Sequence, residues 1–92
     1  MAKTIWKYPL VAKDRQTLGI PANAKLLTVQ VQEPEFGGMP SPMLWALVDT
    51  DEHTEPVELA IYGTGFNLPD DPGQYIATYQ MGPFVWHVFH VA

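Results

Sequence analysis

The side chains that could carry out catalysis are few and lie far apart along the chain. Cysteine is absent, Ser41 lies between two prolines, and the remaining candidates are three histidines. His87 and His90 are three positions apart, and on a strand they point to opposite faces, so they cannot bind one metal ion together. No histidine has an acid at a spacing that would orient it as a general base. We therefore expect a protein that is not an enzyme and that holds no metal and no cofactor.

A second set of residues is better suited to binding than to catalysis. Gln30 and Gln32 lie on the polar face of a segment with alternating apolar residues, while Trp6, Lys7 and Tyr8 offer rings and a positive charge. Neutral amides read a base or a sugar through hydrogen bonds, and aromatic rings stack on it. These five residues are the predicted ligand-binding residues. The alternative is a plain solvent-exposed sheet face, where glutamine and threonine are common.

The C-terminal segment FVWHVFHVA, residues 84–92, has two histidines as its only polar side chains. On a strand, Phe84 and Trp86 lie on one face, and His87 and Phe89 lie on the other. Both faces are apolar, and burial of each large side chain is worth about 1.5–3 kcal/mol. One face belongs to the core, so the other needs a second sheet, a partner subunit or a ligand. We predict a homo-oligomer that associates through Phe84, Trp86, His87 and Phe89.

Hydrophobic residues recur with period two along most of the chain, as is typical of half-buried strands. Clusters of Pro, Gly, Asn and Asp separate the periodic segments and mark turns. The pattern predicts about six short strands, with a seventh, smaller one at 17–20, and leaves a helix open only at 12–18 or 68–72. We expect a single all-β domain over residues 1–92, a compact antiparallel barrel or sandwich with little or no helix, connected as a meander of hairpins. The six segments are 4–8, 24–32, 42–49, 56–65, 73–81 and 84–92.

The alternation also predicts which side chains share a face. Leu27 and Val29 are expected on one face of their strand, opposite the glutamines. Tyr75 and Ala77 are expected together on one face of theirs. Residues 42–49 are apolar on both faces until the final aspartate, which predicts a central strand.

The charges are distributed unevenly along the chain. The net charge is −5, all five cations lie within the first 25 residues, and nine of the ten carboxylates follow them. The simplest interpretation is that the basic N-terminal part packs beside the acidic remainder, because opposite charges on neighbouring strands attract. The alternative is a basic patch for an anionic ligand. Five cations are too few to suggest a nucleic-acid partner. The sequence lacks a signal run and a membrane span, so we expect a cytoplasmic protein without a membrane partner.

Five stretches, in order, carry a resemblance to a known family: TIWKYPL, AKLLTVQVQ, LWALVD, IYGTG and FVWHVF. The chain resembles a group of small uncharacterised proteins encoded by bacteriophages, prophages and some bacteria. The resemblance implies a phage-type origin and supplies no activity, catalytic residue or ligand. Between the second and third stretches the chain carries EPEFGGMPSP, which looks longer than the loop usual in the family and has a tip suited to contacting a partner.

Small phage proteins without catalytic groups usually act by binding. We therefore expect a non-enzymatic, oligomeric accessory protein in the host cytoplasm that inhibits a host factor, such as a protein of an antiviral defence system. One alternative is a binder that sequesters a nucleotide-type signalling ligand at the predicted residues. Another is a minor structural or assembly module of the virion.

Overall fold

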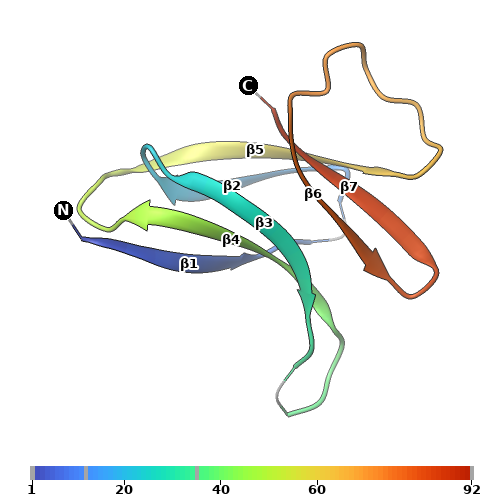
Figure 1. Cartoon of the computed structure of the whole chain (residues 1–92), viewed down its shortest axis with the longest axis horizontal. Helices are drawn as coiled ribbons and strands as arrows, with labels where there is room; N and C mark the ends of the chain where they lie inside the picture. The colour runs from blue at the N-terminus through green and yellow to red at the C-terminus, as the bar shows by residue number, and fades with distance from the viewer. Residues whose placement is uncertain (1, 12, 35, 92) are drawn as a thin grey trace.

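The computed structural model describes residues 2–11, 13–34 and 36–91 (Figure 1). Glu35 and Ala92, which belong to the predicted partner-contacting loop and the predicted C-terminal strand, lie outside the described residues. The described part is all-β, as expected, and contains seven strands and no helix. The strands are β1 (Lys3–Pro9), β2 (Arg15–Pro21), β3 (Lys25–Gln32), β4 (Ser41–Asp49), β5 (Thr54–Gly63), β6 (Gln74–Met81) and β7 (Phe84–Val91).

The expected six strands become seven because β2 is a full strand rather than a small element at 17–20. It pairs with β5 in antiparallel register over its whole length, from Arg15 opposite Ala60 to Pro21 opposite Thr54. The local pattern of β2 is weak because it includes Gly19 and ends in a proline. Its strand conformation therefore depends on a pairing with residues about 40 positions away.

The strands form two antiparallel sheets in a sandwich-like arrangement, not a closed barrel (Figure 1). The three-stranded sheet has the order β1-β4-β3, and the four-stranded sheet has the order β2-β5-β7-β6. The predicted meander is wrong, because only β3–β4 and β6–β7 are hairpins of consecutive strands. The apolar strands β4 and β7 need a neighbour on each side, and each takes one of them from a distant part of the chain.

The core lies between the two sheets and is built from small and branched side chains. The three-stranded sheet contributes Val29, Leu44 and Val48, and the four-stranded sheet contributes Leu59 and Val88, each no more than 1% exposed. Burying each such side chain stabilises the fold by about 1.5–3 kcal/mol. The central position predicted for 42–49 is confirmed, because β4 lies between β1 and β3.

Two β-bulges change the predicted faces of β3 and β6. In β3 the register shifts between Leu26 and Thr28, so Leu27 is 38% exposed while Val29 is buried. In β6 the register shifts between Tyr75 and Ala77, so Tyr75 is 54% exposed while Ala77 is buried. A bulge adds one residue to a strand and reverses the alternation beyond it. The predictions that Leu27 joins Val29 and that Tyr75 joins Ala77 are therefore wrong.

The two sheets approach each other along one side, where β3 and β6 lie side by side without sharing a ladder (Figure 1). The molecule measures 41 × 41 × 16 Å. The described residues form these two sheets and no further helix or strand. The outward-facing side of each sheet is therefore covered by no other element in the part of the chain described. That part contains no helix that could span a membrane.

Candidate binding sites

The outer face of the three-stranded sheet brings together three of the five predicted ligand-binding residues. The Lys7 Nζ donates a hydrogen bond of 2.8 Å to the Gln32 Oε1, although the two residues are 25 positions apart. Gln30 lies on the same face, opposite Met43 of β4. The Lys7 Nζ also lies 5.8 Å from the centre of the Trp45 ring. This face thus combines a cation, two amides and an indole.

The other two predicted residues, Trp6 and Tyr8, point toward the other face of β1, since they pair with the buried Ala46 and Leu44. Trp6 is nevertheless 43% exposed, because β1 is an edge strand. Tyr8 is packed against the core, its hydroxyl is buried, and that oxygen has no hydrogen-bond partner among the described residues. Desolvation of this hydroxyl raises the pKa of Tyr8. Tyr8 therefore lies at the core margin, on the opposite face of β1 from Lys7.

A shallow depression of about 540 Å³ runs along the β1 edge of this sheet. We call it the tryptophan hollow, and it is bordered by Ile5, Trp6, Lys7 and Trp45. The sequence prediction missed Trp45 because this residue sits in a segment that is apolar on both faces. Its position between Leu44 and Ala46 could have identified it as an outward-facing residue, because neighbouring side chains on a strand point to opposite faces.

Three lysines lie on this outer face of the sheet. The register places Lys3, Lys7 and Lys25 on the outer face of the sheet, around Leu47 and Trp45. Within the described residues, none of these three lysines forms an ion pair. The nearest acid by register is Asp49, opposite Lys3, and it is 8% exposed and accepts a 3.0 Å hydrogen bond from the backbone of Asp51.

The expected neutralisation of the basic N-terminal part occurs at one place in the described structure. Arg15 of β2 and Glu58 of β5 form an ion pair of 2.5 Å at the edge of the four-stranded sheet. The hydrogen bond and charge of Glu58 raise the pKa of Arg15 further above its ordinary value. The pairing expected from the sequence is thus present on the four-stranded sheet, and binding of an anion by the lysines of the three-stranded sheet stays a prediction.

The outer face of the four-stranded sheet carries aromatic side chains in place of cations. Phe89 of β7 lies between Tyr62 of β5 and Tyr75 of β6, with ring centres 5.9 and 5.7 Å away in edge-to-face geometry. Such ring pairs contribute about 0.5–1.5 kcal/mol beyond the area that they bury. We call Tyr62, Tyr75 and Phe89 the aromatic stripe.

His87 lies beside the aromatic stripe in a chain of hydrogen bonds. Its Nε2 is 2.8 Å from the Thr64 hydroxyl, and its Nδ1 is 2.9 Å from the Thr78 hydroxyl, which is 2.7 Å from the hydroxyl of Tyr75. Both ring nitrogens are thus occupied, and His90 lies on the opposite, inner face of β7. Among the described residues no three His, Asp or Glu side chains are close enough to hold a metal ion. The arrangement holds the imidazole in one orientation on the sheet surface.

The four residues predicted to mediate self-association are divided between different environments. His87 and Phe89 lie on the outer face, whereas Trp86 packs against the core. Phe84 is 61% exposed, and its ring centre lies 6.1 Å from that of Trp86. These two residues border an apolar pocket of about 290 Å³ at one end of the sandwich, together with Tyr79.

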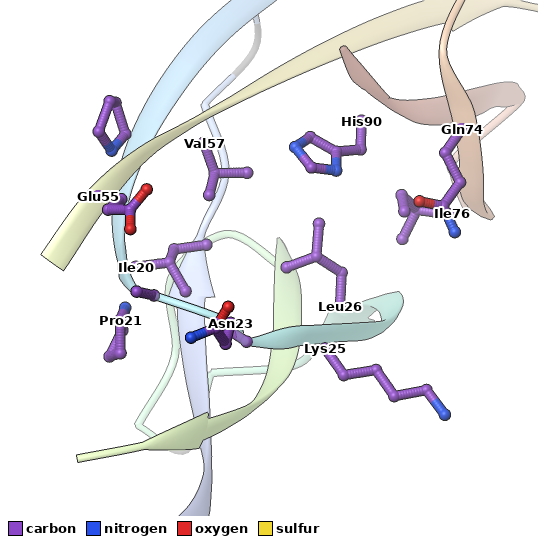
Figure 2. A pocket seen from close by; sticks show the side chains of 13 residues that line it. Ile20, Pro21, Asn23, Lys25, Leu26, Glu55, Val57, Gln74, Ile76 and His90 are labelled. Carbon is purple, nitrogen blue, oxygen red and sulfur yellow. The ribbon is translucent and has the colours of Figure 1, made fainter. Parts of the chain in front are cut away.

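A larger pocket of about 520 Å³ opens between the layers at the beginnings of β3 and β6 (Figure 2). Its apolar part includes Ile20 and Val57, and Figure 2 shows the ring of His90 and the carboxylate of Glu55 on facing sides. Glu55 is already paired with His53 at 2.9 Å, and the Lys25 side chain points away from the space. The pocket thus contains a carboxylate that is already in contact with an imidazole, and the ammonium group of Lys25 points away from it. It was not predicted because its lining comes from the ends of five strands.

The loop between β3 and β4 carries the most exposed apolar side chains of the described part. Phe36 is 93% exposed and Met39 is 81% exposed. They lie within the EPEFGGMPSP segment that was predicted to contact a partner, and that contact stays a prediction.

Taken together, the fold is an antiparallel β-sandwich whose two layers present chemically different outer faces. The chain belongs to a family described as a domain of unknown function, DUF7352, which matches residues 1–92. This membership agrees with the expectation of an uncharacterised family, and the family description carries no phage origin, activity or ligand. No curated protein and no solved structure matches the chain.

Proposed function

We propose that this protein acts by binding another protein and not by catalysis, as a self-associating accessory protein of phage type. The observation that carries the proposal is the aromatic stripe, which lies on an outer sheet face that no other helix or strand of the described residues covers. Phe89 is at the centre of this face, because β7 lies between β5 and β6. Its two neighbouring strands supply the tyrosines that contact it.

Three properties of this face favour association with a second copy of the chain. It is poor in charge, since its Arg15 and Glu58 neutralise each other. Its polar side chains are held in place by the hydrogen bonds of His87, so little side-chain entropy is lost on binding. Four strands about 4.8 Å apart and roughly 20 Å long give a footprint of about 400 Å². Because side chains project from the sheet, the solvent-accessible area of this face is larger than its flat footprint. A standard interface buries ~800 Å² of accessible area per partner.

The substitution Phe89→Asp tests self-association. A carboxylate at the centre of a dehydrated interface is costly, so we expect an oligomer for the wild type and a monomer for the variant in native mass spectrometry. Gln80→Glu is the control, because it adds the same charge at the exposed margin of the same sheet face and should leave the oligomer intact. Circular dichroism verifies that both variants fold. A monomeric wild type, or a folded Phe89→Asp protein that still assembles, contradicts the proposal.

We propose further that the target of the assembly is a host factor, as in the phage-type setting that the resemblance implies. Expression of the chain in bacteria that carry an antiviral defence system should raise the number of phage plaques. Phe89→Asp should abolish the increase and Gln80→Glu should retain it. An equal number of plaques with and without the protein, for each defence system tested, argues against inhibition of such a factor.

A further inference from the structure

We propose that the tryptophan hollow on the outer face of the three-stranded sheet binds a mononucleotide, with the base on the ring of Trp45 and the phosphate among the lysines. This site lies on the other layer from the aromatic stripe. The proposal goes beyond the protein-binding function and does not depend on it.

The rings that border the hollow provide the contact for a base. Trp45 is half-buried on the outer face of β4, and Trp6, 43% exposed, borders the depression from the edge strand β1 although its side chain points toward the other face. An exposed indole ring keeps apolar surface in contact with water. A planar base that stacks on the ring removes this surface from water, and that favours binding. Ile5, 60% exposed, adds an apolar side to the depression. A purely hydrated anion such as phosphate would leave these rings uncovered.

The positive charge around the hollow provides the contact for a phosphate. Lys7 borders the hollow directly, Lys3 is four residues away on β1, roughly 13 Å along the strand, and Lys25 lies two strands from Ile5, roughly 10 Å away. Within the described residues none of these lysines is ion-paired, and the protein as a whole carries a net charge of −5. Three lysines that form no ion pair among the described residues, on a protein of net negative charge, attract an anion to this face.

The two glutamines distinguish a nucleotide site from a general anion patch. Gln32 accepts the 2.8 Å hydrogen bond from Lys7 and thereby holds the ammonium group close to Trp45. Gln30 is exposed on the same face and has both a donor and an acceptor for the edge of a base. The combination of ring, amide and cation therefore matches the base and the phosphate of a mononucleotide better than it matches an acidic peptide or a simple anion.

The test is a titration of the wild-type protein with three probes: AMP, adenosine and inorganic phosphate. We expect AMP to bind and to quench tryptophan fluorescence, and adenosine and phosphate to bind at least about tenfold more weakly, since each lacks one part of the recognition. Binding of AMP should weaken as salt is raised, because the lysines are exposed to solvent. Phosphate that binds as tightly as AMP overturns the assignment and leaves an anion patch, and absence of AMP binding overturns the site.

Two matched variants locate the binding. Lys7→Ala should lower the affinity for AMP about tenfold, because it removes one charge-assisted hydrogen bond to the phosphate. Lys13→Ala removes an exposed lysine that lies outside the hollow and should leave the affinity unchanged. Both variants should unfold at the wild-type temperature, because neither lysine is buried. Equal effects of the two substitutions would mean that AMP responds only to the overall charge, and the proposal would then be wrong.

Discussion

At the scale of single residues, the most informative side chain is Tyr8, because it was predicted to bind a ligand and instead carries a buried hydroxyl. That oxygen has no hydrogen-bond partner among the described residues, while the ring packs against the core. An unpaired buried hydroxyl costs about 1–3 kcal/mol relative to a paired one. The ring of Tyr8 therefore stabilises the fold, whereas its hydroxyl does not.

Replacing Tyr8 with phenylalanine should raise the free energy of unfolding by roughly 1 kcal/mol, because the ring is kept and the unpaired hydroxyl is removed. Urea denaturation at neutral pH measures the change. Thr17→Val, which removes an exposed hydroxyl from β2, is the control and should have little effect. A Tyr8→Phe protein that is less stable than the wild type would mean that the hydroxyl has a partner in solution.

The same prediction has a second readout at alkaline pH. Burial raises the pKa of Tyr8 and of Tyr79 above the ordinary value of 10.0, so the folded state holds both protons more tightly than the unfolded state. The stabilisation is complete below pH 10 and is lost as the pH rises through the raised values. Tyr8→Phe should lose less stability over that window than the wild type, with the remainder due to Tyr79.

At the scale of elements, the junction before β6 depends on one glycine. Gly73 has a φ of +99°, and a Cβ at this position would overlap the backbone carbonyl oxygen of His90 in β7. This close approach places the start of β6 against the end of β7, where Gln74 pairs with His90. Since the obstacle is backbone, it cannot move away as a flexible side chain would.

Gly73→Ala should therefore destabilise the protein by more than about 2 kcal/mol, because it combines a strained φ with overlap against backbone. Gly37→Ala is the matched control. Gly37 has a φ of +87°, but a Cβ there meets nothing within 4 Å, so the cost should be the conformational strain alone, about 1 kcal/mol. Thermal unfolding of the two variants separates overlap from strain. Equal losses would show that β6 and β7 are not as close as the structure places them.

At the scale of the whole molecule, the described residues form two layers with separate outer faces. One face is basic and carries the tryptophan hollow, and the other is neutral and carries the aromatic stripe. Side chains on opposite outer faces of the sandwich are separated by both sheets and the core between them. Substitutions at such distances usually act independently.

The two faces should therefore be separable by mutation. Phe89→Asp should change the oligomeric state and leave the affinity for AMP within about twofold of the wild type, and Lys7→Ala should do the reverse. Native mass spectrometry and the AMP titration, applied to both variants, give the four measurements. Loss of AMP binding in a folded Phe89→Asp protein would show that the nucleotide site needs the assembled form.

The sequence alone determined that the protein is all-β, because period-two alternation and turn residues are local properties of the chain. It also identified β4 as a central strand, since a segment that is apolar on both faces needs a neighbour on each side. The tertiary structure decided everything that depends on pairing between distant segments. The weak strand β2 exists because of β5, and the bulges at Leu27 and Ile76 turn side chains that the alternation placed in the core toward the surface. The tertiary structure also placed Lys7 beside Gln32 and Trp6 near Trp45, because β4 pairs with β1 on one side and with β3 on the other.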